Sequence, residues 1–234
     1  MTASKVNCEA VDQGSGIGDQ APDPKSPIPD PKSQIPELMR LPRSFYAQPT
    51  RRLAKALLGC RVVRGLDGQR LSGVIVETEA YIGENDLACH ARAGRTARTE
   101  VMYGRPGLAY VYFTYGLHWM LNVVSERDDY PAAVLIRAIE PVEGVALMQA
   151  ARGPRPIGDL TNGPAKLCQA LRIDRALNGV DLTDDRSAMW IEADRSVPAR
   201  SILSGPRIGL GSTPEPWLSK PWRYWITGNP FVSK

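Results

Sequence analysis

The sequence has little material for a metal centre or a disulfide framework. Its 234 residues include four cysteines and two histidines, and no two cysteines stand in a C-x-x-C spacing. A structural zinc site usually takes four Cys or His ligands in paired spacings, so we expect no metal site. The cysteines, at positions 8, 60, 89 and 168, have the dispersed pattern of reduced intracellular thiols.

Long apolar runs are missing as well. No stretch approaches the roughly 18 apolar residues of a membrane span, and the N-terminus has no basic region followed by an apolar run. We therefore expect a soluble, cytoplasmic protein that does not act at a membrane, nucleoid-associated if its source is bacterial.

Residues 1–40 are rich in Gly, Pro, Asp and Ser, and they contain a tandem seven-residue repeat, 22–28 followed by 29–35. Such a segment buries too little apolar surface to offset its ordering entropy, so we predict a disordered tail followed by a single domain over 41–234. A docking arm for a partner is the alternative. The tail holds four Lys/Arg and six Asp/Glu, so the net charge of +4 for the whole chain becomes +6 for 41–234. A balance of that size is weak evidence for phosphate binding.

The first half of the domain predicts a helix and a hairpin. A helix is expected over Thr50–Leu58, with Thr50 as its N-cap and Gly59 as its stop. Strands over Cys60–Arg64 and Ser72–Tyr81 flank an Asp67-Gly68 turn, which is a hairpin signal.

The second half predicts further strands and a helix. Strands are expected over Tyr110–Tyr115 and Ala132–Ile139, with Gly116–Asn122 continuing the first, and a helix over Ala165–Leu171. Short strands alternate with Gly/Pro turns in the last sixty residues. The predicted fold class is α+β, a single domain with a curved, mostly antiparallel β-sheet flanked by helices.

A carboxylate and an aromatic ring share one face of the predicted strand around residue 79. The two-residue period of a strand puts Glu77, Glu79 and Tyr81 on one face. A solvated face with two exposed carboxylates is the alternative interpretation.

Three arginines follow within ten residues. Arg92, Arg95 and Arg98 stand beside His90 among small residues, and arginines so spaced suit phosphate oxygens. Solvated surface charge and a structural histidine are the alternatives.

Tyrosines dominate the strand that follows. Tyr110 and Tyr112 alternate with apolar residues, and Tyr115 precedes Gly116 at a predicted turn. Aromatic rings stack on nucleic-acid bases and can fill the gap left by a base rotated out of a duplex.

Several separate blocks carry a family resemblance. They are Ile75–Tyr81, Met102–Gly116, Leu135–Pro141, Asn162–Leu171 and Pro221–Ser233. In these blocks the chain resembles the alkyladenine, or 3-methyladenine, DNA glycosylases of the mammalian type, from about residue 43 to the end.

The resemblance implies a monofunctional DNA glycosylase that flips damaged purines out of duplex DNA and hydrolyses their bond to deoxyribose. The implied substrates are 3-methyladenine and 7-methylguanine, with hypoxanthine and ethenoadenine left open. The expected partner is double-stranded DNA containing damaged purines, the enzyme is expected to be a monomer, and no cofactor is implied. No lysine stands out as a Schiff-base nucleophile, so strand cleavage is not expected.

The resemblance also assigns roles residue by residue. Glu79 matches the general base that deprotonates the attacking water, and Arg137 a residue beside that water. Further matches cover the flipped base, the vacated duplex position, the guanine amino group and the DNA backbone. They are Tyr81, His90 and Tyr112 for the base, Tyr115 for insertion and Asn122 for the amino group. Lys166 lies in a segment that resembles one whose helix N-terminus and lysine meet a phosphate, and a solvated surface lysine is the alternative. Arg92, Arg95 and Arg98 are the further expected phosphate contacts, because of their spacing.

Some positions depart from the family pattern, namely Cys89, Thr99, Glu100 and Met120, and they leave the range of accepted bases open. Two other classes fit parts of the sequence. A non-catalytic nucleic-acid-binding module would use the tyrosines and arginines, but it gives no reason for a carboxylate beside the pocket. A carbohydrate glycosidase would use Glu77 and Glu79, but no opposed acid and nucleophile can be identified.

Overall fold

An antiparallel sheet of eight strands organises the computed structural model, which describes residues 1–2 and 39–233. Its main path runs β3-β4-β5-β2-β1-β6, and β7 and β8 attach as a pair through β8 to β2. The strands are β1 Arg61–Leu66, β2 Gln69–Ile82, β3 Ala109–Thr114, β4 His118–Val124, β5 Ala132–Glu143, β6 Met189–Glu192, β7 Ile202–Gly205 and β8 Arg223–Ile226. All their pairings are antiparallel, which confirms the predicted α+β class and sheet type.

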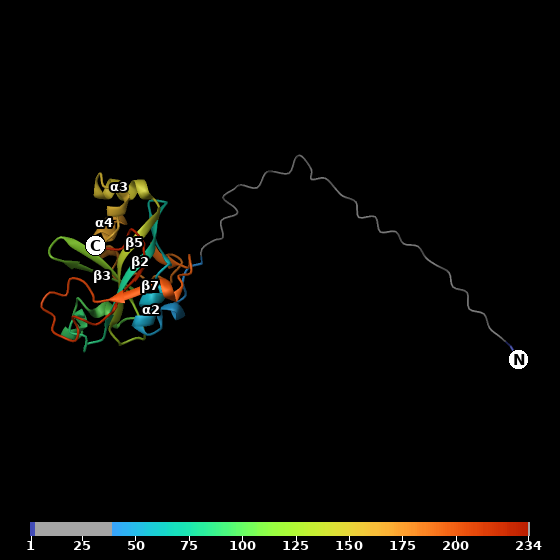
Figure 1. Cartoon of the computed structure of the whole chain (residues 1–234), viewed down its shortest axis with the longest axis horizontal. Helices are drawn as coiled ribbons and strands as arrows, with labels where there is room; N and C mark the ends of the chain where they lie inside the picture. Colours follow the sequence, from blue (N-terminus) through green and yellow to red (C-terminus); the bar gives the residue numbers. More distant parts are fainter. Residues whose placement is uncertain (3–38, 234) are drawn as a thin grey trace. The chain divides into compact units, whose positions relative to one another are not determined.

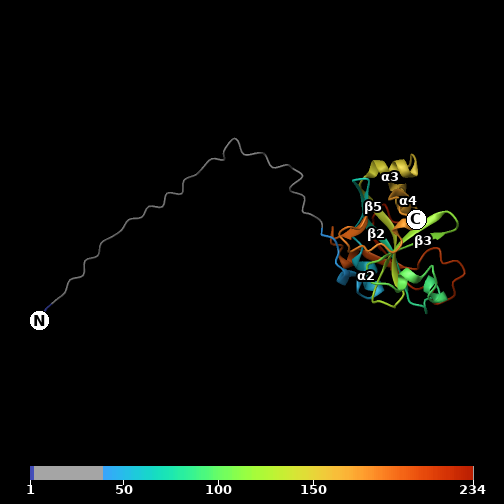
Figure 2. The ribbon, with the colours of Figure 1, turned by 180° about the vertical axis from the view of Figure 1, so that it is seen from behind.

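Four α-helices accompany this sheet within the described residues. They are α1 Arg43–Tyr46, α2 Thr50–Ala56, α3 Val145–Arg152 and α4 Pro164–Ala170. Helices α3 and α4 lie together at one end of β2 and β5, and α2 lies at the other end (Figures 1 and 2). None of the helices in 39–233 is long and apolar enough to cross a bilayer. The predicted disordered tail falls mainly on residues 3–38, outside the described part of the chain.

The predicted hairpin between β1 and β2 is confirmed. Asp67 and Gly68 both have positive φ, 49° and 74°, which is the conformation of a two-residue turn whose twist matches the flanking strands. This turn sets the register that pairs Leu66 with Gln69 and Arg61 with Val74.

Two local predictions were wrong, and one helix was missed. Thr50 is the first residue of α2 rather than its cap, and its backbone amide and hydroxyl both donate to Glu126 Oε1, at 3.1 and 2.6 Å. The 116–122 segment reverses direction at a three-residue turn and returns as β4 instead of continuing β3. Helix α3 was not anticipated, because its short amphipathic pattern follows directly on the long strand β5.

The core lies between the sheet and the helices α2 and α4. It contains Leu53 and Leu57 from the α2 region, Leu167 and Leu171 from the α4 region, and alternate residues of the central strands. A second, smaller apolar cluster surrounds Tyr110, with Cys89 and Met102 packed against the same side of β3. In the middle of β2 and β5 even polar side chains are buried, among them Glu77, Glu79 and Arg137.

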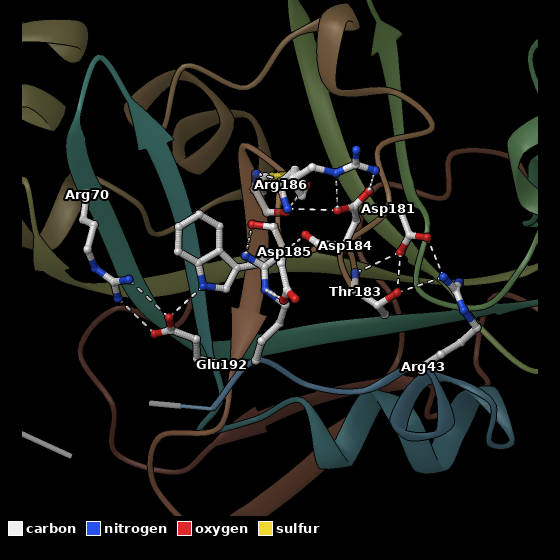
Figure 3. Close-up of polar contacts among 12 residues, drawn as sticks. Arg43, Arg70, Asp181, Thr183, Asp184, Asp185, Arg186 and Glu192 are labelled. Atoms are coloured by element: carbon white, nitrogen blue, oxygen red, sulfur yellow. Dashed lines mark hydrogen bonds and ion pairs between the residues drawn. The ribbon is translucent and has the colours of Figure 1, made fainter. Parts of the chain in front are cut away.

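Polar contacts tie the segment before β6 to helix α1, and β6 itself to β2 (Figure 3). Arg43 donates to Asp181 and Thr183, and Arg70 forms a two-point ion pair with Glu192 at 3.2 and 3.0 Å. Trp190 Nε1 also donates to Glu192. These contacts fasten β6 as the edge strand.

Candidate active site

A cavity of about 380 Å³ opens where the central strands meet two loops. Each of four neighbouring strands contributes to its wall, through Tyr81 of β2, Tyr112 of β3, Asn122 of β4 and Arg137 of β5. The loop after β7 closes one side with Ile208. A cavity with aromatic walls and a few convergent polar groups is the usual form of a ligand site.

Glu79 lies immediately behind this wall. Its carboxylate is fully buried, and each of its oxygens is held by residues that line the cavity. Oε2 accepts a 2.8 Å hydrogen bond from the Tyr81 hydroxyl, and Oε1 accepts a 2.7 Å bond from the Ile208 amide. Arg137 Nη1 forms an ion pair with Oε1 at 3.2 Å. The alternative of an exposed, solvated carboxylate is therefore wrong.

Burial raises the pKa of Glu79 above its ordinary value. Arg137, the Ile208 amide and the Tyr81 hydroxyl oppose that rise, because each stabilises the ionised form. A buried carboxylate with a raised pKa is better suited to accept a proton near neutral pH than an exposed one.

Arg137 reaches Glu79 because the ladder between β2 and β5 is irregular. The register shifts on both sides of Glu77 and leaves Val76 and Arg137 without partners, one on each strand. A bulge bends a strand locally and redirects the side chain at that point. This bulge brings a buried guanidinium against two glutamates, Glu77 and Glu79.

Glu77 is the second glutamate in contact with Arg137. It accepts hydrogen bonds from the Arg223 guanidinium at 2.9 Å and from the backbone and hydroxyl of Ser233, at 2.8 and 2.9 Å. It does not line the cavity. Its contacts assign it to holding Arg137 and the C-terminal segment in place.

Aromatic rings form the wall opposite the carboxylate. His90 and Tyr112 pack edge to face with ring centroids 4.5 Å apart, and a 3.0 Å hydrogen bond joins His90 Nδ1 to the Tyr110 hydroxyl. Burial, together with nearby Arg98 and Arg92, lowers the pKa of His90 to about 4. The imidazole is therefore neutral at physiological pH.

The expected gate residue lies deeper in the same cavity. Asn122 is buried and donates from Nδ2 to the carbonyl of Tyr110 over 3.2 Å. Of the positions that depart from the family pattern, Cys89 and Met120 line the cavity. Thr99 and Glu100 do not, and the Thr99 hydroxyl holds the loop through bonds to Thr96 and Gly94.

Tyr115 stands at the tip of the hairpin between β3 and β4, which projects from the body of the ribbon (Figures 1 and 2). Its side chain is 79% exposed and its φ is +53°, a conformation uncommon for a bulky residue. It also lines the cavity mouth, and Leu117 beside it is 75% exposed. Neighbouring exposed apolar side chains at the mouth of a pocket often mark an interaction surface.

The four expected phosphate contacts are in different surroundings. Arg92 lines the cavity and donates to the Leu87 carbonyl, and Arg98 lies over the Tyr112 ring, 5.1 Å from its centroid. Arg95 is paired with Asp129 at 2.7 Å and with Glu100, away from the cavity. Lys166 donates to Asn162 near the start of α4, whose Pro164 lines the cavity.

Sequence reasoning missed the best-formed ion pair next to the site. Arg207 and Asp86 are both fully buried and joined by two hydrogen bonds of 2.6 and 2.9 Å. Arg207 lies in the loop 206–209, in which the next residue, Ile208, is 39% exposed. No local pattern pairs residues 121 positions apart in sequence. Among the described residues, no cluster of His, Cys, Asp and Glu is arranged to hold a metal ion.

Comparison with known proteins agrees with this architecture. The sequence profile of the methylpurine-DNA glycosylase family matches residues 44–230. The chain is 49% identical over 195 residues to a protein of Methanocella arvoryzae, covering 83% of this chain and 96% of that protein. It is 46% identical over 196 residues to one of Carboxydothermus hydrogenoformans, covering 84% and 100%. Both relatives carry the name "Putative 3-methyladenine DNA glycosylase".

A profile match over most of the domain and identity near one half define the class. The chain belongs to the methylpurine-DNA glycosylase family. It is a DNA glycosylase, an enzyme of DNA repair that acts on DNA. The alternative of a non-catalytic binding module is thereby set aside.

Proposed function

We propose that this enzyme rotates alkylated or deaminated purines out of duplex DNA into the cavity and hydrolyses their N-glycosidic bond, leaving an abasic site. The observation that carries the proposal is a buried carboxylate one hydrogen bond behind an aromatic cavity wall. Tyr81, Ile208 and Arg137 separate Glu79 from the cavity. A small movement of these groups gives a water molecule access to the carboxylate.

Tyr81, His90 and Tyr112 bind the flipped base in this proposal. Alkylation at N3 or N7 leaves a purine with a positive charge, and electron-rich aromatic faces attract cations. The depressed pKa of His90 supports this role, since a neutral imidazole does not repel a cationic base. Asn122, in the floor of the cavity, would disfavour bases carrying a guanine-type amino group.

Glu79 acts as the general base in the hydrolysis. It takes a proton from water, the water oxygen bonds to the sugar carbon, and the electron pair of the N-glycosidic bond leaves with the purine. Arg137 orients the carboxylate through its 3.2 Å ion pair. The negative charge of Glu79 also stabilises positive charge that develops on the sugar. The nucleophile is water and no lysine takes part, so the enzyme has no lyase activity.

The DNA lies across the cavity mouth. Tyr115 inserts into the duplex position that the base vacates, and its exposure at the hairpin tip supports this. Arg92, Arg98 and Lys166 contact phosphates around the mouth, and Arg95 contributes least because Asp129 and Glu100 already engage it. The enzyme acts as a monomer. It catalyses the first step of base excision repair.

The proposed substrates are 3-methyladenine and 7-methylguanine, with hypoxanthine and ethenoadenine as further candidates. Cys89 and Met120 in the cavity wall decide which of these fit. Nothing in the cavity supports a carbohydrate glycosidase, because Glu77 is engaged by Arg223 and Ser233 outside it.

Base release tests the proposal. Wild type, Glu79→Gln and the charge control Asp128→Asn, an exposed residue between β4 and β5, are assayed on alkylated genomic DNA and on a duplex with one hypoxanthine. We expect wild type and Asp128→Asn to release methylated purines, and Glu79→Gln to release almost none while it still binds the duplex. Equal release by Glu79→Gln and wild type would overturn the role of Glu79. Hypoxanthine release sets the range of the pocket.

A further inference from the structure

The buried ion pair between Asp86 and Arg207 joins the two segments that frame the cavity. Two parallel hydrogen bonds, of 2.6 and 2.9 Å, connect the guanidinium to both carboxylate oxygens. Neither side chain is exposed. Withdrawing two charges from water is costly even when they are paired, so such a pair is weak evidence for stability and raises the question of another use.

Arg207 packs against one of the groups that hold Glu79 and directly precedes another in the chain. Its guanidinium lies over the Tyr81 ring, 4.7 Å from the centroid, and donates to the carbonyl of Ala80 over 2.9 Å. The next residue along the chain is Ile208, whose amide donates to Glu79 Oε1. The position of Arg207 therefore sets both the ring and the amide.

Asp86 connects this ion pair to the loop that carries His90. Its carboxylate accepts hydrogen bonds from the amides of Ile82 and Ala88, at 3.2 and 3.1 Å, and its carbonyl accepts one from Cys89 over 2.8 Å. His90 follows directly. One ion pair thus fixes the end of β2, the start of the His90 loop and the loop that carries Ile208.

We propose that Asp86 and Arg207 are positioning residues for hydrolysis, which hold Tyr81 and the Ile208 amide against Glu79 and align the His90 loop with them. This inference rests on the proposed function of Glu79 as the general base. Neither residue touches the DNA or the reacting atoms. A misplacement of about 1 Å at a catalytic group can lower a rate about 100-fold, and a two-point guanidinium contact is well suited to prevent it.

Two variants test the pair without leaving an unpaired buried charge. Arg207→Lys keeps the charge but cannot reproduce the planar two-point contact. The double variant Asp86→Asn with Arg207→Gln removes both charges, keeps the size of the Asp86 side chain and shortens that of Arg207. Glu192→Gln is the control, because it breaks a two-point pair of the same geometry with the more exposed Arg70, away from the cavity (Figure 3).

Single-turnover base release is compared with affinity for an abasic duplex. We expect Arg207→Lys and the double variant to lose about 100-fold in the rate of base release, while their affinity for abasic DNA stays close to that of wild type. Glu192→Gln is expected to keep both. Losses in all three variants that follow their melting temperatures would show a purely structural role and overturn the proposal, as would an unchanged rate in Arg207→Lys and the double variant.

Hydrogen exchange of the Ile208 amide tests the same pair without any activity. We expect this amide to exchange at least about tenfold faster in the double variant than in wild type, because opening of the loop frees it from Glu79. The buried amide of Val62 in β1 reports global unfolding, and it should be unchanged. Equal protection of Ile208 in both proteins would overturn the proposal. If wild type releases no base, the proposed function fails, and the exchange comparison still decides whether the pair positions the loop.

Discussion

The Tyr81 hydroxyl donates a 2.8 Å hydrogen bond to Glu79 Oε2, two residues earlier on the same face of β2. Tyr81 lines the cavity and Glu79 does not. The residue proposed to stack on the damaged purine therefore also donates a hydrogen bond to Glu79, the proposed general base. Recognition of the base and activation of water are mechanically connected through one side chain.

Replacing Tyr81 with Phe separates these two roles, because it keeps the ring and removes the hydroxyl. The hydroxyl helps to lower the pKa of Glu79, so its loss raises that pKa. Glu79 must be ionised to accept a proton, and the acid side of the pH–rate profile should therefore move to higher pH. The hydrogen bond stabilises the ionised carboxylate, so its loss disfavours that form and moves the profile in this direction.

The pH–rate profile of single-turnover base release measures this effect. Tyr103→Phe is a matched control, because the Tyr103 hydroxyl donates to Glu84 over 2.6 Å and lies outside the cavity lining. Its profile should coincide with that of wild type. The charged and titratable groups facing Glu79 stay in place in both variants, namely Arg137, Glu77, Arg207 and Tyr112. A Tyr81→Phe profile identical to wild type would contradict the prediction.

His90 should make stability depend on pH. Its folded-state pKa is lowered from 6.5 to about 4, so below pH 6.5 the unfolded chain binds a proton that the folded protein excludes. The free energy of unfolding should fall as pH drops from 6.5 towards 4, by on the order of 3 kcal/mol in total from this residue. Urea unfolding of wild type and His90→Gln checks this. The variant should show a smaller dependence in that window.

Tyr115→Ala should weaken the handling of base-paired lesions without destabilising the fold. The side chain is 79% exposed, so its removal costs little buried area. Its positive φ is as unfavourable for Ala as for Tyr, so the backbone conformation should not change the stability. An inserted ring contributes about 1–3 kcal/mol, so base release from a duplex should fall about tenfold or more. Affinity for a strand that already carries an abasic site should change much less. Equal losses in both measurements would contradict a wedge role, and Leu203→Ala, another exposed apolar residue, serves as control.

Arg98→Ala and Arg95→Ala should differ in the salt dependence of DNA binding. Each phosphate contact contributes about one unit to the slope of log affinity against log salt. Arg98 lies over Tyr112 beside the cavity, whereas Arg95 is paired with Asp129 and Glu100. The slope should decrease by about one for Arg98→Ala and by less for Arg95→Ala. A larger decrease for Arg95→Ala would show that its acidic partners release it when DNA binds.

Local signals were sufficient for much of the sheet. The Asp-Gly pair at 67–68 favours the positive φ angles of a tight turn, and the alternation of tyrosines with apolar residues favours a strand. Both were therefore predictable from short stretches of sequence. The same alternation correctly put Glu77 and Glu79 on one face. Their burial was not predictable, because it depends on β5, β8 and the loop after β7 arriving from distant parts of the chain.

The supporting contacts were beyond sequence reasoning for a related reason. Arg207 and Asp86 look like ordinary surface charges in the sequence, and only the fold brings them together. The bulge at Arg137 likewise follows from the pairing of two strands and not from either strand alone. The prediction of Thr50 as the N-cap was wrong because Glu126, distant in sequence, accepts hydrogen bonds from the Thr50 amide and hydroxyl at the start of the helix.

The contact between Glu77 and Ser233 has a consequence for biosynthesis. Glu77 shares Arg137 with Glu79, and three of its hydrogen bonds come from Arg223 and Ser233. The ribosome must therefore translate the message at least as far as codon 233 before this charge network is complete. A nascent chain that has already folded its tyrosine hairpin still lacks these contacts behind its carboxylates.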